Sequence, residues 1–198
     1  MKIQKIAKLC KRQSTIEVVD LVLPGEIVQF VGNGSALYAL YGMPRISEDN
    51  AFGLFDIPKD KKKVFSTARF SAAELGYSFQ DNPEGDTAVF RSPILLGFNG
   101  GSYEVLRTDA GFRVIESVYL EPVADGPFTL WLRHTRTGGV RIIVKDADFQ
   151  LVAIIEPSRI PDDVIDAMGE IVGISTPSMF TDPDTGEIIQ HDEEATEE

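Results

Sequence analysis

The chain has 198 residues, of which 43% are hydrophobic and 25% charged, and its formal net charge is −12. This composition is typical of a globular protein with one domain or two small ones, and no apolar run approaches the ~18 residues of a transmembrane helix. The single cysteine, Cys10, excludes an intramolecular disulfide and a thiolate zinc site, and two histidines leave little for histidine-based catalysis. No apolar signal region follows Met1, so we expect a cytoplasmic protein without a membrane partner.

The N-terminal third alternates helix and strand signals. Apolar residues recur every three or four positions from Lys2 to Arg12, which predicts a helix. β-Branched residues then predict a strand over 16–23, and a Pro-Gly turn leads into a second strand over 26–31. The sequence Gly32-Asn33-Gly34 is typical of a hairpin turn and predicts a returning strand over 35–41.

The next segment is less regular. Ser47 followed by acidic residues predicts a capped helix start, although residues 51–57 fit either a helix or a strand. Pro58 predicts a short helical turn that carries four lysines. Residues 66–86 give no clear element and end in a loop over 81–86.

The remainder reads as a sheet followed by a helix. Turn signals separate six candidate strands, at 87–96, 102–107, 111–121, 127–135, 139–145 and 149–155. Short turns without intervening helices favour antiparallel pairing. An acidic helix is predicted over 161–172. The fold class is therefore α+β, mainly an antiparallel sheet with an N-terminal helix, a C-terminal helix and a disordered acidic tail.

Charge is unevenly distributed along the chain. Residues 1–63 carry 10 basic and 7 acidic side chains, whereas eight acidic side chains lie in the last 18 residues. We expect one globular domain over 1–180, with a subdivision near 82–86 as an alternative, and a flexible tail over 181–198. Such a tail either keeps the protein soluble or acts as a decoy or partner-binding segment.

Two sets of cations are candidates for a nucleic-acid surface. Lys2, Lys5, Lys8, Lys11 and Arg12 line roughly 15 Å of the first helix, and such a row neutralises phosphates independently of sequence. Its alternative role is an ordinary solvated helix face.

The second set lies on the predicted hairpin of residues 127–145. Alternation places Trp131 and Arg133 on one face of the first strand, and Arg141 and Lys145 on one face of its partner strand. An aromatic ring flanked by cations on an exposed sheet can stack a base or hold a phosphate. The alternative is that Trp131 is buried and the arginines pair with acids on neighbouring strands.

Signals for catalysis are weak. We expect no catalytic residues, no metal ligands and no cofactor, because no nucleophile–base pair or complete metal-ligand spacing is present. A hydrolase or metal enzyme built from scattered acids such as Glu116, Glu121 and Asp125 remains an alternative.

Two resemblances involve the first third of the chain. Gly32–Pro44 followed by Leu54–Pro58 resembles an uncharacterised protein family of bacteriophages and integrated elements of gut bacteria, which implies no known activity. The order of a basic N-terminal helix, Gly25–Phe30, a returning strand and Phe52–Ile57 resembles phage-type DNA sliding clamps. In that family an acidic ring exposes basic helices to DNA, and the resemblance implies this place for the lysines of the first helix.

These observations predict a non-enzymatic binding or accessory protein of phage or mobile-element origin that acts through protein or nucleic-acid contacts. A clamp-like DNA processivity factor is the first alternative. We expect a protein partner, with DNA and a second copy of the chain as further candidates.

Overall fold

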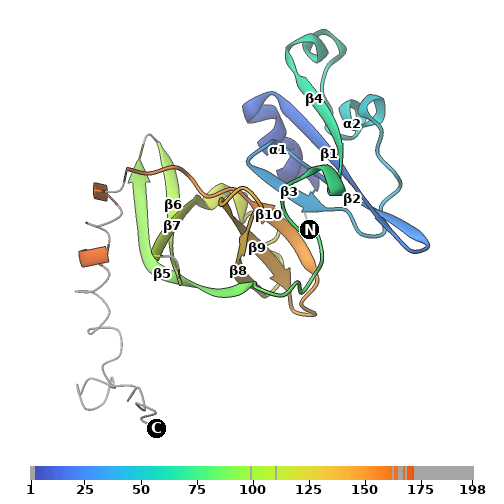
Figure 1. Ribbon diagram of the computed structural model, residues 1–198. Coiled ribbons are helices and arrows are strands. Elements are labelled where there is room, and N and C mark those ends of the chain that lie inside the picture. Colours follow the sequence, from blue (N-terminus) through green and yellow to red (C-terminus); the bar gives the residue numbers. More distant parts are fainter. Residues whose placement is uncertain are drawn as a thin grey trace. The chain divides into compact units, whose positions relative to one another are not determined.

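The computed structural model describes residues 3–171, apart from 99, 110, 162, 165, 166 and 168 (Figure 1). The chain forms two units, Met1–Ser158 and Arg159–Glu198. In the second unit the described residues between 163 and 171 are helical, within the predicted helix. The predicted acidic tail over 181–198 lies outside the described residues.

The first unit contains a long helix, several short helices and ten strands. The helices are α1 (Ile3–Gln13), α2 (Glu48–Leu54), η1 (Lys59–Val64), η2 (Ala72–Glu74) and η3 (Ser117–Tyr119), the last three being 3₁₀ helices. The strands are β1 (Thr15–Leu23), β2 (Glu26–Gly32), β3 (Ala36–Ala39), β4 (Ser66–Ser71), β5 (Thr87–Phe98), β6 (Gly101–Thr108), β7 (Gly111–Glu116), β8 (Phe128–His134), β9 (Val140–Asp146) and β10 (Leu151–Ile155).

All ten strands belong to one sheet in the order β4-β1-β2-β3-β10-β9-β8-β5-β6-β7. Every neighbouring pair is antiparallel except β1 and β4, which run parallel, as Figure 1 shows for these two strands. The predicted α+β class with a mainly antiparallel sheet is confirmed. The predicted strand over 111–121 is too long, because the chain turns into η3 after Glu116 and buries Tyr119 and Leu120 from consecutive positions.

The turn between β2 and β3 shows why the glycine-rich sequence is needed there. A Cβ on Gly32 would lie 1.6 Å from the carbonyl oxygen of Ala36, so only glycine fits. Gly34 has a φ of 85°, which favours glycine, and the Asn33 side chain accepts hydrogen bonds from the amides of Ser35 and Ala36. The predicted hairpin is therefore confirmed.

One face of the sheet carries the larger core. Helix α1 buries Ile6, Leu9 and Cys10 in this core, while α2 contributes Phe52 and its C-cap residue is the buried Phe55. Residues of β6, β7 and η3 join the same cluster, so the end of the sheet folds toward the face that α1 covers.

The opposite face of the sheet is covered by part of the segment 66–86, for which the sequence predicts no clear element. Phe79 packs edge-on against Phe30 of β2, with ring centres 4.9 Å apart, and Tyr77 stacks on Phe79 at 5.3 Å. After β4 the chain thus crosses this face, and residues 75–86 close a second core that includes Ile143 and Leu151.

Candidate functional site

Two cations of the predicted helix face pair with acids of the same unit. Arg12 donates two hydrogen bonds to the carboxylate of Glu116, at 2.6 and 2.7 Å, and these bonds hold the pKa of Arg12 above its usual value. Lys5 lies 3.4 Å from Glu121. Two of the acids considered for catalysis, Glu116 and Glu121, are thereby engaged in ion pairs that attach α1 to the η3 region.

The other described lysines of this face remain available. Lys8 and Lys11 are exposed and form no ion pair within the described part of the chain, whereas Lys2 lies outside it. Helix η1 adds further exposed lysines of the same kind. We call the following five residues the lysine cluster: Lys8, Lys11, Lys59, Lys61 and Lys63.

A hollow joins the two parts of the lysine cluster. It has a volume of about 630 Å³ and lies between the C-terminal end of α1 and η1, since Lys11 and Lys61 both line it. The rest of its lining combines apolar groups with two carboxylates and a hydroxyl: Ser14, Asp56, Ile57, Pro58, Asp60, Val64 and Phe65.

Backbone conformation at this hollow is unusual. Ser14 has a φ of 50° and Asp56 a φ of 49°, in the left-handed region that non-glycine residues rarely adopt. Ser14 directly follows α1 and Asp56 follows α2, so both residues redirect the chain at the walls of the hollow. No periodicity in the sequence could have revealed this convergence.

The second predicted set has the expected register but is not an exposed surface. Trp131 pairs with Ile143 and Arg133 with Arg141, so the predicted alternation is correct. The side chains of Arg133 and Lys145, however, are only 4% and 2% exposed. The hypothesis of a nucleic-acid surface on an exposed hairpin is wrong for these two residues, because residues 76–86 cover them.

A single carboxylate holds both buried cations. Asp86 accepts two hydrogen bonds from the guanidinium of Arg133, at 2.8 and 2.7 Å, and lies 3.1 Å from Lys145 Nζ. Lys145 also donates to Asn82 and lies 4.4 Å from the ring centre of Trp131. We call Asp86, Arg133 and Lys145 the Asp86 cluster.

The remaining member of the predicted set is also paired. Arg141 lies 3.5 Å from a carboxylate oxygen of Glu156, and its guanidinium lies 5.2 Å from the ring centre of Tyr77. The two arginines thus pair with acids, as the alternative prediction states, whereas Trp131, which it places in the interior, is only half-buried.

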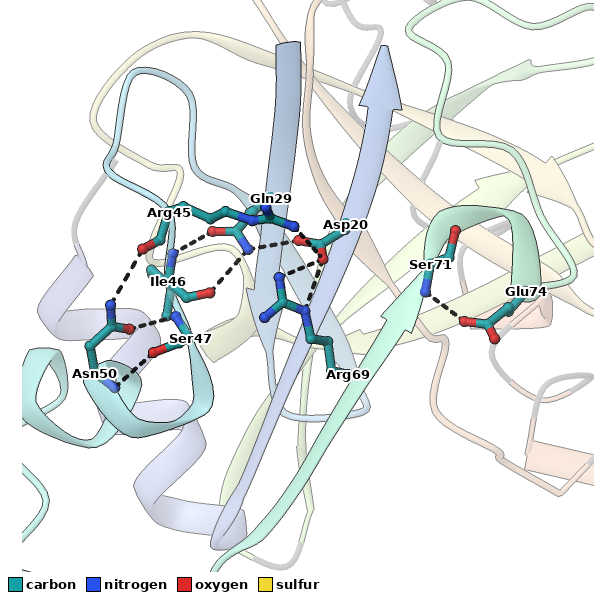
Figure 2. Close-up of polar contacts among 9 residues, drawn as sticks. All are labelled: Asp20, Gln29, Arg45, Ile46, Ser47, Asn50, Arg69, Ser71 and Glu74. Carbon is teal, nitrogen blue, oxygen red and sulfur yellow. Dashed lines mark hydrogen bonds and ion pairs between the residues drawn. The ribbon is translucent and has the colours of Figure 1, made fainter.

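A further polar network centres on Asp20 of β1 (Figure 2). Its carboxylate accepts hydrogen bonds from Arg69 at 2.6 and 2.9 Å, from Arg45 at 3.3 Å and from Gln29 at 2.7 Å. Burial acts to raise the pKa of Asp20, but the bonds from Gln29 and Arg69 outweigh it and lower the pKa. The Gln29 amide also bonds both backbone groups of Ile46, which fixes the segment leading into α2. Sequence reasoning missed this network, because its members are up to 49 positions apart.

A second hollow, of about 520 Å³, lies beside Asp20 and includes Tyr77, His134 and Arg136 in its lining. Among the described residues, no group of three or more His, Cys, Asp and Glu side chains is placed to hold a metal ion. No described helix combines the length and apolarity needed to cross a bilayer.

Comparison of the chain with models of known protein families, with curated protein sequences and with solved structures finds no match. The resemblances to a phage protein family and to sliding clamps therefore stay predictions.

Proposed function

We propose that this chain is a non-enzymatic accessory protein that binds a polyanion, such as the phosphate backbone of a nucleic acid, through the lysine cluster. The observation that carries the proposal is the contrast between cations. Internal ion pairs engage Lys5, Arg12, Arg133 and Lys145. The five residues of the lysine cluster, in contrast, are exposed and have no carboxylate partner in the described part of the chain.

The physical argument is that several exposed lysines around one hollow give an acidic protein a local positive surface. A localised positive surface steers a polyanion to that surface even when the net charge is negative, as the net charge of −12 is here. Phosphate neutralisation by lysine releases counterions, so the interaction has to weaken steeply with salt.

The test uses a fluorescently labelled single-stranded 20-mer and anisotropy at several salt concentrations. Reversal of two lysines, one on each side of the hollow, as Lys11→Glu with Lys61→Glu, is expected to lower affinity by about tenfold or more at low salt and to reduce the slope of log affinity against log salt.

The matched control is Arg107→Glu with Arg136→Glu. Both arginines are exposed and lie outside the lysine cluster, and their reversal changes net charge by the same amount. Absence of binding by the unaltered protein at low salt, or an equal loss in the control, would refute the proposal.

A clamp-like processivity factor is the second candidate. The observation in its favour is that a basic helix precedes a three-stranded meander, as that resemblance implies, while β4 has a neighbour on only one side in the sheet. A clamp has to form a closed ring, and light scattering that gives a monomer with and without DNA would exclude it.

A further inference from the structure

We propose that the hollow between α1 and η1 receives an unpaired base of a single-stranded nucleic acid while the lysine cluster holds the flanking phosphates. This inference rests on the proposed polyanion binding and specifies its ligand as single-stranded and base-bearing. A hollow of about 630 Å³ falls within the range of about 300–1,000 Å³ that small-molecule sites occupy, so it has room for one base.

The lining suits a flat, partly apolar group. The apolar part of the lining consists of Ile57, Pro58, Val64 and Phe65. The ring of Phe65 also makes an edge-on contact with Phe52, with ring centres 6.0 Å apart. Bases stack on aromatic and apolar side chains in a manner that tolerates any sequence.

The two carboxylates argue for a base in the hollow instead of a phosphate. Asp56 and Asp60 would repel a phosphate placed between them, but their oxygens accept hydrogen bonds from the exocyclic amino groups of cytosine, adenine or guanine. Lys11 and Lys61 line the same hollow and are exposed, as phosphate contacts require. The charges in the hollow thus suit a nucleotide whose base contacts the aspartates and whose phosphate contacts the lysines.

Backbone strain supports the same assignment. Ser14 and Asp56 both adopt left-handed conformations, and both line this hollow. Strained non-glycine residues cluster where a fold maintains a binding geometry at a cost in stability. Phe149, the third described non-glycine residue with positive φ, lies instead in the turn between β9 and β10.

The experiment compares three probes of equal length by anisotropy: oligo-dC, oligo-dT and an abasic strand with the same phosphates. We expect oligo-dC to bind about five- to a hundredfold more tightly than the abasic strand, the range that stacking of one base gives. Oligo-dT, which lacks the amino group, is expected to bind between the two.

A pair of matched valines localises the effect. Val64 in the hollow is 67% exposed and Val22 on β1 is 69% exposed, so each tolerates Val→Asp without loss of core packing. V64D is expected to reduce the affinity for oligo-dC to nearly that for the abasic strand, whereas V22D adds the same charge and is expected to keep the preference for bases.

The outcomes separate the two proposals. Lysine-dependent binding that is equal for oligo-dC and the abasic strand would overturn the base site and leave polyanion binding intact. A base preference that survives V64D, or is abolished by V22D, would also overturn the site at this hollow. No binding of any probe at low salt would overturn polyanion binding itself.

Discussion

Replacement of Asp86 by asparagine tests how the second face of the sheet is held closed. Asn has nearly the shape of Asp but no charge, so Asp86→Asn leaves Arg133 and Lys145 in place with no carboxylate between them. Both side chains are at most 4% exposed, so water cannot replace the lost partner without opening the segment over 76–86.

The expected cost follows from this burial. Removal of one partner from a buried ion pair destabilises a protein by about 3–5 kcal/mol, because a charge is left uncompensated. Here two cations share the carboxylate, which places the expected loss near the top of that range. Addition of Lys145→Met to Asp86→Asn removes one unpaired cation and is expected to restore part of the stability.

Urea unfolding followed by tryptophan fluorescence measures the change at the site itself, since Trp131 is the chain's single tryptophan and its ring contacts Lys145. With a slope of about 2 kcal/mol per molar urea, a loss of 4 kcal/mol lowers the midpoint by about 2 M. Asp148→Asn, at an exposed turn position, is the control and is expected to change stability by less than about 0.5 kcal/mol. A loss in Asp86→Asn no larger than in this control would refute the reasoning.

Three further predictions concern single sites. Burial and the charge of a neighbouring carboxylate raise the pKa of Glu17, so ionisation of this side chain opposes folding. Glu17→Gln is therefore expected to raise the melting temperature at pH 7 and to have little effect at pH 3, where Glu and Gln are both neutral. An equal effect at the two pH values would contradict this prediction. Gly32→Ala places a Cβ against the Ala36 carbonyl and is expected to lower the free energy of unfolding in urea by more than about 4 kcal/mol. Gly126→Ala is the control, because a Cβ at Gly126 has no neighbouring atom within 4 Å. Burial raises the pKa of Cys10 to about 12, so a thiol reagent at pH 8 is expected to label Cys10 only as fast as the protein unfolds. Rapid labelling of the folded protein would contradict this and would show that α1 opens locally.

Much of the fold was predictable because its signals are local. The spacing of Ile6 and Cys10 identified α1, Ser47 identified the start of α2, and turn residues such as Gly34 and Gly138 separated the strands. These features depend on neighbours a few positions away, which sequence patterns record directly.

The parts that sequence patterns missed depend on distant partners. Arg69 of β4 lies on a strand whose parallel neighbour, β1, begins some fifty positions earlier, and Phe79 is buried by residues of β2. The candidate site was only half predictable for the same reason. Lys8 and Lys11 form a visible pattern on one helix, whereas their proximity to Lys61 depends on how α1 and η1 pack around the hollow.

The pairing of β3 with β10 has a consequence for the order of folding. Strand β3 finds its second neighbour only in β10, so the two halves of the sheet are joined by residues more than a hundred positions apart. Contacts of such long range slow folding, because the chain between them has to be ordered before they form. During synthesis the strands β1–β3 therefore form before β10 is available. Until β10 pairs with β3, the edge of β3 and the apolar side chains of Phe30 and Leu37 are exposed and can associate with other chains. We expect this protein to fold only after the whole of its first unit has left the ribosome.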